Sequence, residues 1–322
     1  MSNLEYCILG DWGTSFLRLY LYKINGEQAD TLETKIGPGV KDSCDFESTL
    51  FECASPWIRE YGKPPIILCG MISSSLGWIE TPYLECPINL SKIKDQVTQV
   101  KFRGHKIAIA PGLTCRNPLE TVDVLRGEET QILGWLHYMG KTSTPQLFCL
   151  PGTHTKWAIV RNTTVEYFLT GMQGELFDLL SRYSVLIPKN EAVSTQPEIE
   201  NLNRFFHQGL ELVNSATRAS LIHTLFSTRS RTAREKLDTQ QAREFLSGQT
   251  IGSDIRGALD VFKNRFDSTN KIALIGAPEL TNRYAAGLQA FNLSCEIMDG
   301  SKASMAGLQS LYKQLNGKKA AA

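Results

Sequence analysis

The sequence lacks several short patterns on which common enzyme classes depend. It has no Gly-x-x-x-x-Gly-Lys-Ser/Thr stretch and no Gly-x-Gly-x-x-Gly after its first strand-like run, which disfavours P-loop enzymes and dinucleotide-binding enzymes. None of its eight cysteines forms a Cys-x-x-Cys pair, and its five histidines have no metal-ligand spacing, so a zinc site is disfavoured. Cysteines scattered through strand-like runs fit reduced thiols, and we expect a cytoplasmic protein.

Strong net charge and long apolar runs are missing as well. The formal net charge is +1, and no apolar run is long enough to span a bilayer. We therefore expect neither a nucleic-acid partner nor a membrane partner, and no secretory leader. The 322 residues predict about two domains, and a hydrophobic content of 42% is enough for a real core.

What the chain does contain is one turn that occurs twice. Residues 8–21 read ILGDWGTSFLRLYL and residues 147–160 read LFCLPGTHTKWAIV, each with a Gly-Thr turn between two apolar runs. Glycine lets backbone N–H groups approach an oxyanion closely and permits the positive φ of tight hairpins. Two copies indicate two related halves that each offer a phosphate-sized turn. The alternative is a pair of ordinary hairpins.

Both turns supply candidate phosphate ligands. The candidates are Gly13, Thr14 and Ser15 in the first turn and Gly152, Thr153, His154, Thr155 and Lys156 in the second. His154 is equally an exposed turn histidine, and Lys156 is equally a surface strand lysine. Asp11 repels phosphate but can hold Mg²⁺, usually through water, and the ion can bridge the phosphates.

Hydrophobic periodicity predicts alternating strands and helices. The predicted strands are 5–11, 16–24, 31–36, 65–70, 106–110, 272–275 and 295–299, and the predicted helices are 45–61, 127–139, 170–186, 204–227, 240–266 and 302–315. We expect Asp45 to cap the first helix, and Thr170 with Gln173 to form a capping box. Residues 187–203 are predicted as a polar loop, and the charged segment 228–239 as a solvated surface.

Several segments, taken in order, resemble the 2-dehydro-3-deoxygalactonokinase family of the acetate and sugar kinase/Hsp70/actin superfamily. They are GDWGTSFLR (10–18), GMISSSLGW (70–78), RGEETQILG (126–134), LPGTHTKWA (150–158), TGMQGELF (170–177), FLSGQTIGSDI (245–255) and IGAPELTNRY (275–284). The resemblance implies an α/β fold of two related actin/hexokinase-like (ribonuclease H-like) domains with mixed sheets, flanking helices and a cleft between them.

The resemblance also implies a division of labour and a reaction. Residues 1–125 would bind mainly the sugar acid and the transferred phosphate, and residues 126–301 mainly ATP, with the final helix 302–316 packing back on the first domain. The implied reaction uses ATP and Mg²⁺ to phosphorylate the terminal C6 hydroxyl of 2-dehydro-3-deoxy-D-galactonate, giving the 6-phosphate and ADP.

Carried onto this sequence, the resemblance implies roles for further residues. The base is Glu128 or Glu129, with Glu128 preferred and Asp11 as the rival, although acidic residues are also favoured by the helix dipole. The adenosine candidates are Gly276, Ala277, Thr281, Asn282 and Arg283. The sugar-acid candidates are Arg18, Met71, Ser73, Ser74, Trp78 and Arg126. Instead of binding the sugar acid, Arg126 could form an ion pair with one of the two glutamates. Trp78 could likewise be a packed core residue.

Other functions remain open on the sequence alone. A kinase for another keto-deoxy sugar acid or sugar is one alternative. A phosphohydrolase of the same superfamily, in which the glutamates orient water, is another, and an ATP-gated binding module is the third. A homodimer is compatible with the sequence.

Overall fold

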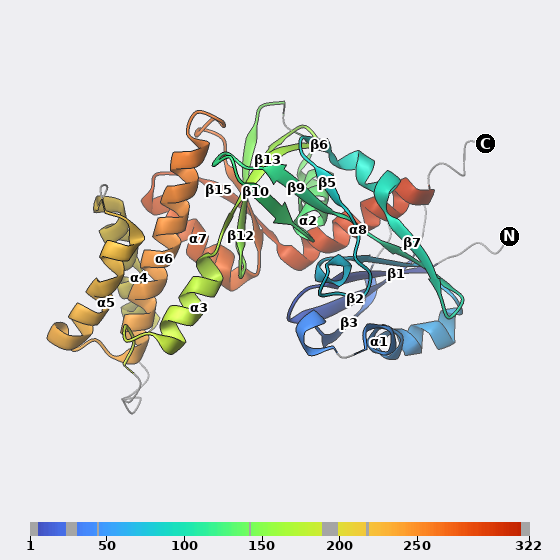
Figure 1. Ribbon diagram of the computed structural model, residues 1–322, viewed down its shortest axis with the longest axis horizontal. Helices are drawn as coiled ribbons and strands as arrows, with labels where there is room; N and C mark the ends of the chain where they lie inside the picture. The colour runs from blue at the N-terminus through green and yellow to red at the C-terminus, as the bar shows by residue number, and fades with distance from the viewer. Residues whose placement is uncertain are drawn as a thin grey trace. The chain divides into compact units, whose positions relative to one another are not determined.

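The computed structural model describes residues 6–23, 31–43, 45–141, 143–188, 199–216 and 219–316. It is a mixed α/β structure, which confirms the predicted fold class (Figure 1). By contacts between Cα atoms the chain divides into two compact units. Unit 1 contains residues 1–143, 160–167 and 298–322, and unit 2 contains residues 144–159 and 168–297. The predicted domains 1–125 and 126–301 stay a prediction.

Unit 1 is built on a six-stranded sheet in the order β3-β2-β1-β4-β8-β7. Its strands are β1 Tyr6–Trp12, β2 Phe16–Lys23, β3 Thr31–Pro38, β4 Ile66–Cys69, β7 Thr98–Phe102 and β8 His105–Ile109. Strands β1, β4 and β8 run parallel, whereas β2, β3 and β7 pair antiparallel with their neighbours. The carboxyl ends of β1 and β4 therefore meet at one edge, where functional residues gather in open α/β sheets.

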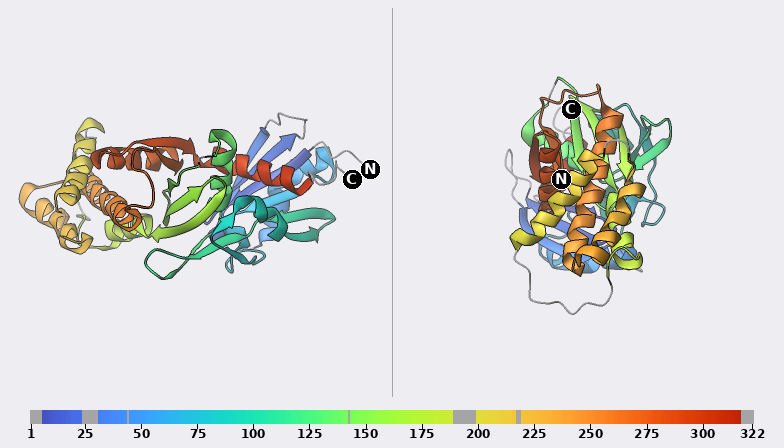
Figure 2. Two further views of the ribbon diagram at one scale, coloured as in Figure 1. Left: turned by 90° about the horizontal axis from the view of Figure 1, so that it is seen from above. Right: turned by 90° about the vertical axis from the view of Figure 1, so that its left-hand side faces the viewer.

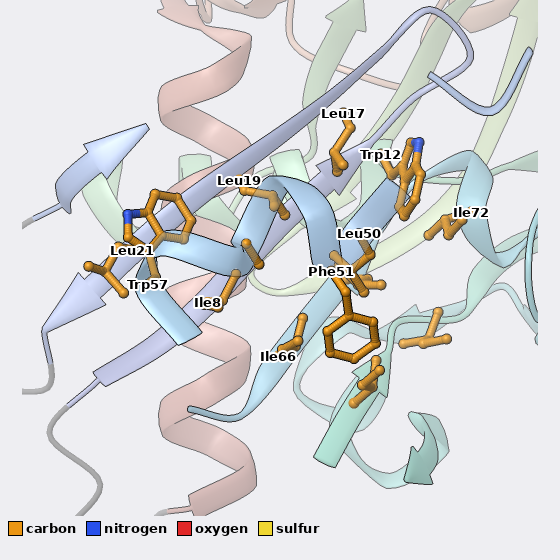
Figure 3. Packing of buried hydrophobic residues seen from close by; sticks show 14 of the residues in the cluster. Ile8, Trp12, Leu17, Leu19, Leu21, Leu50, Phe51, Trp57, Ile66 and Ile72 are labelled. Atoms are coloured by element: carbon orange, nitrogen blue, oxygen red, sulfur yellow. The ribbon is translucent and has the colours of Figure 1, made fainter. Parts of the chain in front are cut away.

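Alternating side chains cover both faces of this sheet. On β2, Leu17, Leu19 and Leu21 belong to the cluster that packs against helix α1, Phe46–Tyr61 (Figure 3). Tyr22, the next residue along β2, faces the other way, and its ring contacts that of Tyr312 on helix α8, Gly300–Asn316. Both faces are buried, which explains why the strands read as nearly continuous apolar runs.

Helix α1 follows the sequence prediction closely. The side chain of Asp45 accepts the backbone N–H of Ser48 at 3.2 Å, so it is the predicted N-cap. Pro56 lies inside the helix without ending it. The short 3₁₀ segment η1, Val40–Asp42, precedes α1 and donates backbone hydrogen bonds to the first Gly-Thr turn, at Gly13 and Thr14.

Two further sheets complete the strand inventory. A three-stranded sheet has the order β10-β9-β5, with β5 Tyr83–Glu85, β9 Gly112–Arg116 and β10 Val122–Leu125. The other has the order β15-β14-β11-β12-β13-β6, with β6 Ile88–Asn89, β11 Gln146–Leu150, β12 Thr155–Arg161, β13 Thr164–Gly171, β14 Ile272–Gly276 and β15 Cys295–Asp299. Segments η2 Met71–Ser73 and η3 Leu90–Gln96 are 3₁₀ helices.

Helix α2, Glu128–Met139, packs closely against α8 within unit 1. A Cβ added at Gly134 would collide with the carbonyl of Ala303, and one added at Gly307 would collide with the carbonyl of Thr130. The two glycines therefore allow the backbones of α2 and α8 to approach each other closely. This contact fixes α8 beside β1 and beside the start of α2.

Unit 2 gathers its helices around α6, Thr239–Phe262 (Figure 2). The neighbours of α6 are α3 Gln173–Tyr183, α4 Ile199–Ser215, α5 Leu221–Glu235 and α7 Pro278–Ala290. Asp238 and Gln241 form a capping box at the start of α6. None of the helices in the described ranges is both long and apolar enough to cross a membrane.

Several local predictions are wrong. The segment 204–227 is two helices, α4 and α5. The charged stretch 228–239 continues α5 to Glu235, and its residues Arg229, Arg234, Glu235 and Lys236 are exposed, as a solvated surface requires. Thr170 lies in β13, and α3 starts at Gln173 after Met172 without a side-chain cap, so the predicted capping box is absent. Of the predicted loop 187–203, residues 199–203 open α4, and 189–198 lie outside the described residues.

Candidate active site

The first Gly-Thr turn joins β1 to β2 in unit 1. Gly13 donates its N–H to the carbonyl of Phe16 at 2.9 Å, and Lys41 donates its N–H to the carbonyl of Thr14 at 3.0 Å, which supports the turn from outside. Thr14 and Ser15 are exposed. Gly13 does not have positive φ, and neither does Gly152 in the second turn, so the expected left-handed conformation is absent. The glycines give close access to the backbone instead.

Asp11 lies deep beside this turn, near the end of β1. Its Oδ2 accepts a hydrogen bond from the Ser304 hydroxyl on α8 at 2.9 Å. Burial raises the pKa of Asp11, while this hydrogen bond and the charge of Arg18, its cross-strand neighbour, act to lower it. No three His, Cys, Asp or Glu side chains form a metal cluster in the described part of the chain. A single carboxylate suits Mg²⁺, which keeps several waters and binds phosphates.

The two glutamates at the start of α2 have different surroundings. Glu128 is partly exposed, and its Oε2 accepts the backbone N–H of Arg126 at 3.0 Å. Glu129 is fully buried, with one oxygen on the N–H of Gly127 at 2.6 Å and the other on the Thr130 hydroxyl at 2.8 Å. Burial, and then the charge of Glu128, raise the pKa of Glu129 to about 7. Glu129 therefore acts as a cap of α2, and Glu128 is the member of the pair that can reach a ligand.

The structure brings the three carboxylates together around one thiol. Cys69 ends β4, and burial followed by the charges of Asp11, Glu129 and Glu128 raises the pKa of its thiol well above the ordinary value. Gly127 has positive φ, and a Cβ there would lie 3.2 Å from Cα of Gly70. All three base candidates thus lie at the carboxyl ends of β1 and β4, within unit 1.

Arg126 does not pair with the glutamates. Its guanidinium donates to the hydroxyls of Ser73 and Thr81 at 2.7 and 2.6 Å and to the carbonyl of Thr81 at 3.0 Å, and it lies 4.2 Å from the ring centre of Tyr83. The side chain is 8% exposed, and its buried Nε has no hydrogen-bond partner among the described residues. A buried cation held only by neutral groups favours an anion nearby.

The other sugar-acid candidates differ in their availability. Arg18 lies directly across from Asp11 on β2 and 5.7 Å from the ring centre of Phe16. Trp78 packs on the core with its ring edge toward Phe102, as its core interpretation predicted, and Met71 packs on the same core. The Ser74 hydroxyl is occupied within its own loop.

The second Gly-Thr turn, in unit 2, abuts the start of α3. The N–H of Glu175 donates to the carbonyl of Thr153 at 3.0 Å, and His154 Nε2 lies 2.5 Å from the Glu175 carboxylate. A Cβ added at Gly174 would collide with the carbonyl of Gly152, so α3 supports the turn directly. Among the described residues other than its two chain neighbours, none places a heavy atom within 4 Å of the position a Cβ would take at Gly152, so these residues leave this side of the turn open.

The side chains that follow this turn face inward. Thr155 is fully buried, and its hydroxyl lies 2.9 Å from the Tyr284 hydroxyl. Lys156 is 7% exposed and donates to the Thr170 hydroxyl at 2.8 Å, so it is not a surface strand lysine. Neither side chain extends into open solvent beside Thr153 and His154.

The third predicted nucleotide element adjoins the second turn. A Cβ at Gly276 would lie 3.2 Å from the carbonyl of Pro151, and Ala277 with Pro278 opens α7 without a side-chain cap. Thr281 is fully buried and bonds backbone carbonyls of its own first turn. Arg283 forms a bidentate pair with Glu244 of α6 at 2.6 and 2.8 Å. Gly276, Ala277 and the exposed Asn282 are therefore the available adenosine candidates.

Two polar residues near these elements were not predicted. Ser304 bonds Asp11 and accepts from the Gln131 amide at 3.2 Å, and nothing in its local sequence marks it. Asp254 accepts hydrogen bonds from Trp157 and Tyr284 at the base of the second turn. Its position inside the run SGQTIGSDI, which is rich in small uncharged residues, was a usable signal, because a carboxylate that is buried with such a run needs hydrogen-bond donors.

Comparisons with known proteins agree with this description. Residues 11–311 match the family model of 2-keto-3-deoxy-galactonokinase. A 2-dehydro-3-deoxygalactonokinase of Rhizobium meliloti strain 1021 is 32% identical over 98% of this chain and 99% of its own. That of Escherichia coli K12 is 31% identical over 94% of this chain and 95% of its own.

Solved structures extend the likeness to three dimensions. A crystal structure described as a 2-dehydro-3-deoxygalactonokinase protein from Sinorhizobium meliloti has a TM-score of 0.79, with 31% identity and 96% of each chain covered. The activator of 2-hydroxyisocaproyl-CoA dehydratase from Clostridium difficile, solved with ADPNP, has a TM-score of 0.53 at 11% identity, covering 98% of each chain, and shares the fold. The chain belongs to the 2-keto-3-deoxy-galactonokinase family.

Proposed function

We propose that this protein transfers the γ-phosphoryl group of ATP to the terminal C6 hydroxyl of 2-dehydro-3-deoxy-D-galactonate, releasing ADP. Family membership and the names of both relatives support the sugar-acid kinase activity. The two Gly-Thr turns support the phosphate chemistry, since each presents exposed backbone and hydroxyl donors.

The observation that carries the proposal is the surroundings of Arg126. Its guanidinium is buried among hydroxyls and an aromatic ring, with no carboxylate partner among the described residues. A sugar acid supplies the missing negative charge, whereas a neutral hexose does not. Charge-assisted hydrogen bonds to a carboxylate are stronger than neutral ones, so this site favours an acid.

Glu128 is the base in this proposal. It is the partly exposed glutamate of the pair, so it can accept the proton of the attacking hydroxyl, whereas both oxygens of Glu129 are held by internal donors. Asp11 is the carboxylate suited to Mg²⁺, because Ser304 occupies one of its oxygens and none of the residues that the structure describes donates a hydrogen bond to the other. When bound, the ion would neutralise charge on the phosphates.

The phosphates of ATP are held by unit 2 in this proposal. The open side of Gly152 and the exposed Thr153 and His154 offer donors to them. Gly276 and Ala277, beside Pro151, extend the same surface toward the adenosine. The buried Thr155 supports the turn instead of binding phosphate.

A coupled ADP-release assay tests the function. We expect release with 2-keto-3-deoxy sugar acids and little with plain hexoses. Release at full rate without any acceptor would identify a phosphohydrolase instead. Arg126→Lys should raise KM for the acid about 10- to 100-fold, because lysine lacks the fork geometry. The matched control is Arg116→Lys on the exposed end of β9, which should leave KM unchanged.

A further inference from the structure

A buried chain of polar groups underlies the second Gly-Thr turn. The Tyr284 hydroxyl on α7 donates to Oδ2 of Asp254 on α6 at 2.8 Å, and the indole N–H of Trp157 on β12 donates to the same oxygen at 3.0 Å. The Thr155 hydroxyl lies 2.9 Å from the Tyr284 hydroxyl. Thr155, Trp157 and Tyr284 are each fully buried. The chain thus joins α6 and α7 to the first residues of β12.

Simple counting of protons fixes the direction of these bonds. An ionised carboxylate only accepts, so the single proton of Tyr284 is directed at Asp254. The Thr155 hydroxyl must then donate to Tyr284. The orientation of the Thr155 hydroxyl is therefore set by the Asp254 carboxylate through two hydrogen bonds. Its O–H group is used in this network and does not donate to a ligand. Removing the Tyr284 hydroxyl would leave both Thr155 and Asp254 short of a partner.

The same carboxylate also braces the other side of the turn. A Cβ at Gly171, the last residue of β13, would collide with the Asp254 side chain, so the strand end and the carboxylate are in close contact. Just beyond it, the Gln173 amide donates to the Thr250 hydroxyl of α6 at 3.0 Å. Gln173 starts α3, whose first turn holds the carbonyl of Thr153 through the N–H of Glu175.

We propose that Asp254 and Tyr284 are positioning residues that hold the second Gly-Thr turn in the conformation that binds nucleotide phosphate. They act through Thr155 on one side of the turn and through the start of α3 on the other. Neither one touches the nucleotide. The nucleotide part rests on the proposed kinase function, whereas the ordering of the turn does not.

The test compares Tyr284→Phe with a control on the same helix bundle. Tyr284→Phe keeps the ring and deletes the hydroxyl. The control, Thr228→Val, deletes another fully buried side-chain hydrogen bond to α6, the 2.6 Å bond to Gln249, at the contact with α5. Two quantities are measured on the full chain: the Kd of ADP by calorimetry, and amide hydrogen exchange of peptides that cover residues 150–158.

We expect Tyr284→Phe to weaken ADP binding about tenfold and to speed exchange in the turn, with Thr228→Val close to wild type in both. Asp254→Asn keeps an acceptor for Tyr284 and Trp157, so it should retain ADP affinity within about twofold, whereas Asp254→Ala should not. Unchanged exchange in Tyr284→Phe, or an equal loss in Thr228→Val, would overturn the inference.

The two proposals fail in different ways. If the wild-type protein does not bind ADP, the nucleotide function has failed, and exchange in the turn still decides whether Asp254 and Tyr284 order it. If wild type binds ADP and Tyr284→Phe binds it equally well, the kinase proposal stands and the positioning role is refuted.

Discussion

Replacing Glu129 with glutamine should stabilise the protein at alkaline pH. Burial and the charge of Glu128 raise the pKa of Glu129 from its ordinary 4.5 to about 7 in the folded state, whereas the unfolded chain has the ordinary value. Between these values the unfolded state loses its proton first. Stability contributed by this group is therefore fully present below pH 4.5 and is lost as the pH rises to about 7.

The size of the effect follows from that gap. At about 1.4 kcal/mol per pH unit, the interval from 4.5 to about 7 corresponds to about 3 kcal/mol lost in the wild type by pH 8. Glutamine carries no charge and so avoids this loss. Its amide oxygen can accept from Gly127, and its NH₂ group can donate to the Thr130 hydroxyl, which is able to accept. The Gly127 N–H and the Thr130 hydroxyl oxygen thus each keep a hydrogen-bond partner.

Urea unfolding at pH 8 and pH 5 provides the measurement. We expect Glu129→Gln to exceed wild type by up to about 3 kcal/mol at pH 8 and by much less at pH 5. Glu52→Gln, at an exposed position of α1, is the control and should change little at either pH. An equal gain at both pH values, or no gain at pH 8, would refute the assignment of a buried, charged Glu129.

Three further changes separate catalysis from packing. Glu128→Gln should lower kcat about 100-fold or more with circular dichroism unchanged, whereas Glu129→Gln should stay within about tenfold of wild type; normal turnover in both would move the base elsewhere. Asp11→Asn should lose most turnover at every Mg²⁺ concentration while keeping its melting temperature, and wild-type activity would remove Asp11 from the mechanism. Gly307→Ala should destabilise unit 1 by about 2 kcal/mol in thermal unfolding, because its methyl group would collide with the Thr130 carbonyl; unchanged stability would contradict the close crossing of α2 and α8.

Strands buried on both faces were predictable from the sequence, whereas partly exposed strands were predicted less consistently: β15 was found and β10 was not. β4 and β14 are fully buried and read as short apolar runs, which is why both were found. β10 was missed because Leu125 is its one buried residue, while Val122 is 75% exposed and Val124 is 41% exposed. Such strands are defined by backbone pairing with distant partners, and composition does not record that.

Helix α5 was misread for a related reason. Its buried stripe consists of Thr224, Thr228 and Thr232, spaced one helical turn apart, and Gln249 of α6 bonds both the Thr228 hydroxyl and the Thr224 carbonyl. In the second half of α5, residues 228–235, a search for apolar periodicity finds Ala233 alone among polar and charged residues. The helix is specified by hydrogen bonds across an interface, which a single segment cannot reveal.

The candidate site shows the same limit at the level of side chains. The glycine–threonine turns were found because the motif is local. What the side chains of these motifs do depends on residues far away in the sequence. The Thr155 hydroxyl is hydrogen-bonded to Tyr284, and Arg283, which was expected at the adenosine, forms an ion pair with Glu244. Long-range pairing thus decided which residues of each motif remain available to a ligand.

The two turns differ in a way that fits unequal tasks. The first turn follows Asp11, and unit 1 places Glu128 and Glu129 within electrostatic reach of the same thiol, so it concentrates negative charge that suits a cation and proton transfer. The second turn follows Leu150 and Pro151, and the deep carboxylate of Asp254 accepts two hydrogen bonds at its Oδ2 beneath the turn. In the proposed reaction, unit 2 would therefore hold the phosphates without repelling them, and unit 1 would supply the groups for the chemistry.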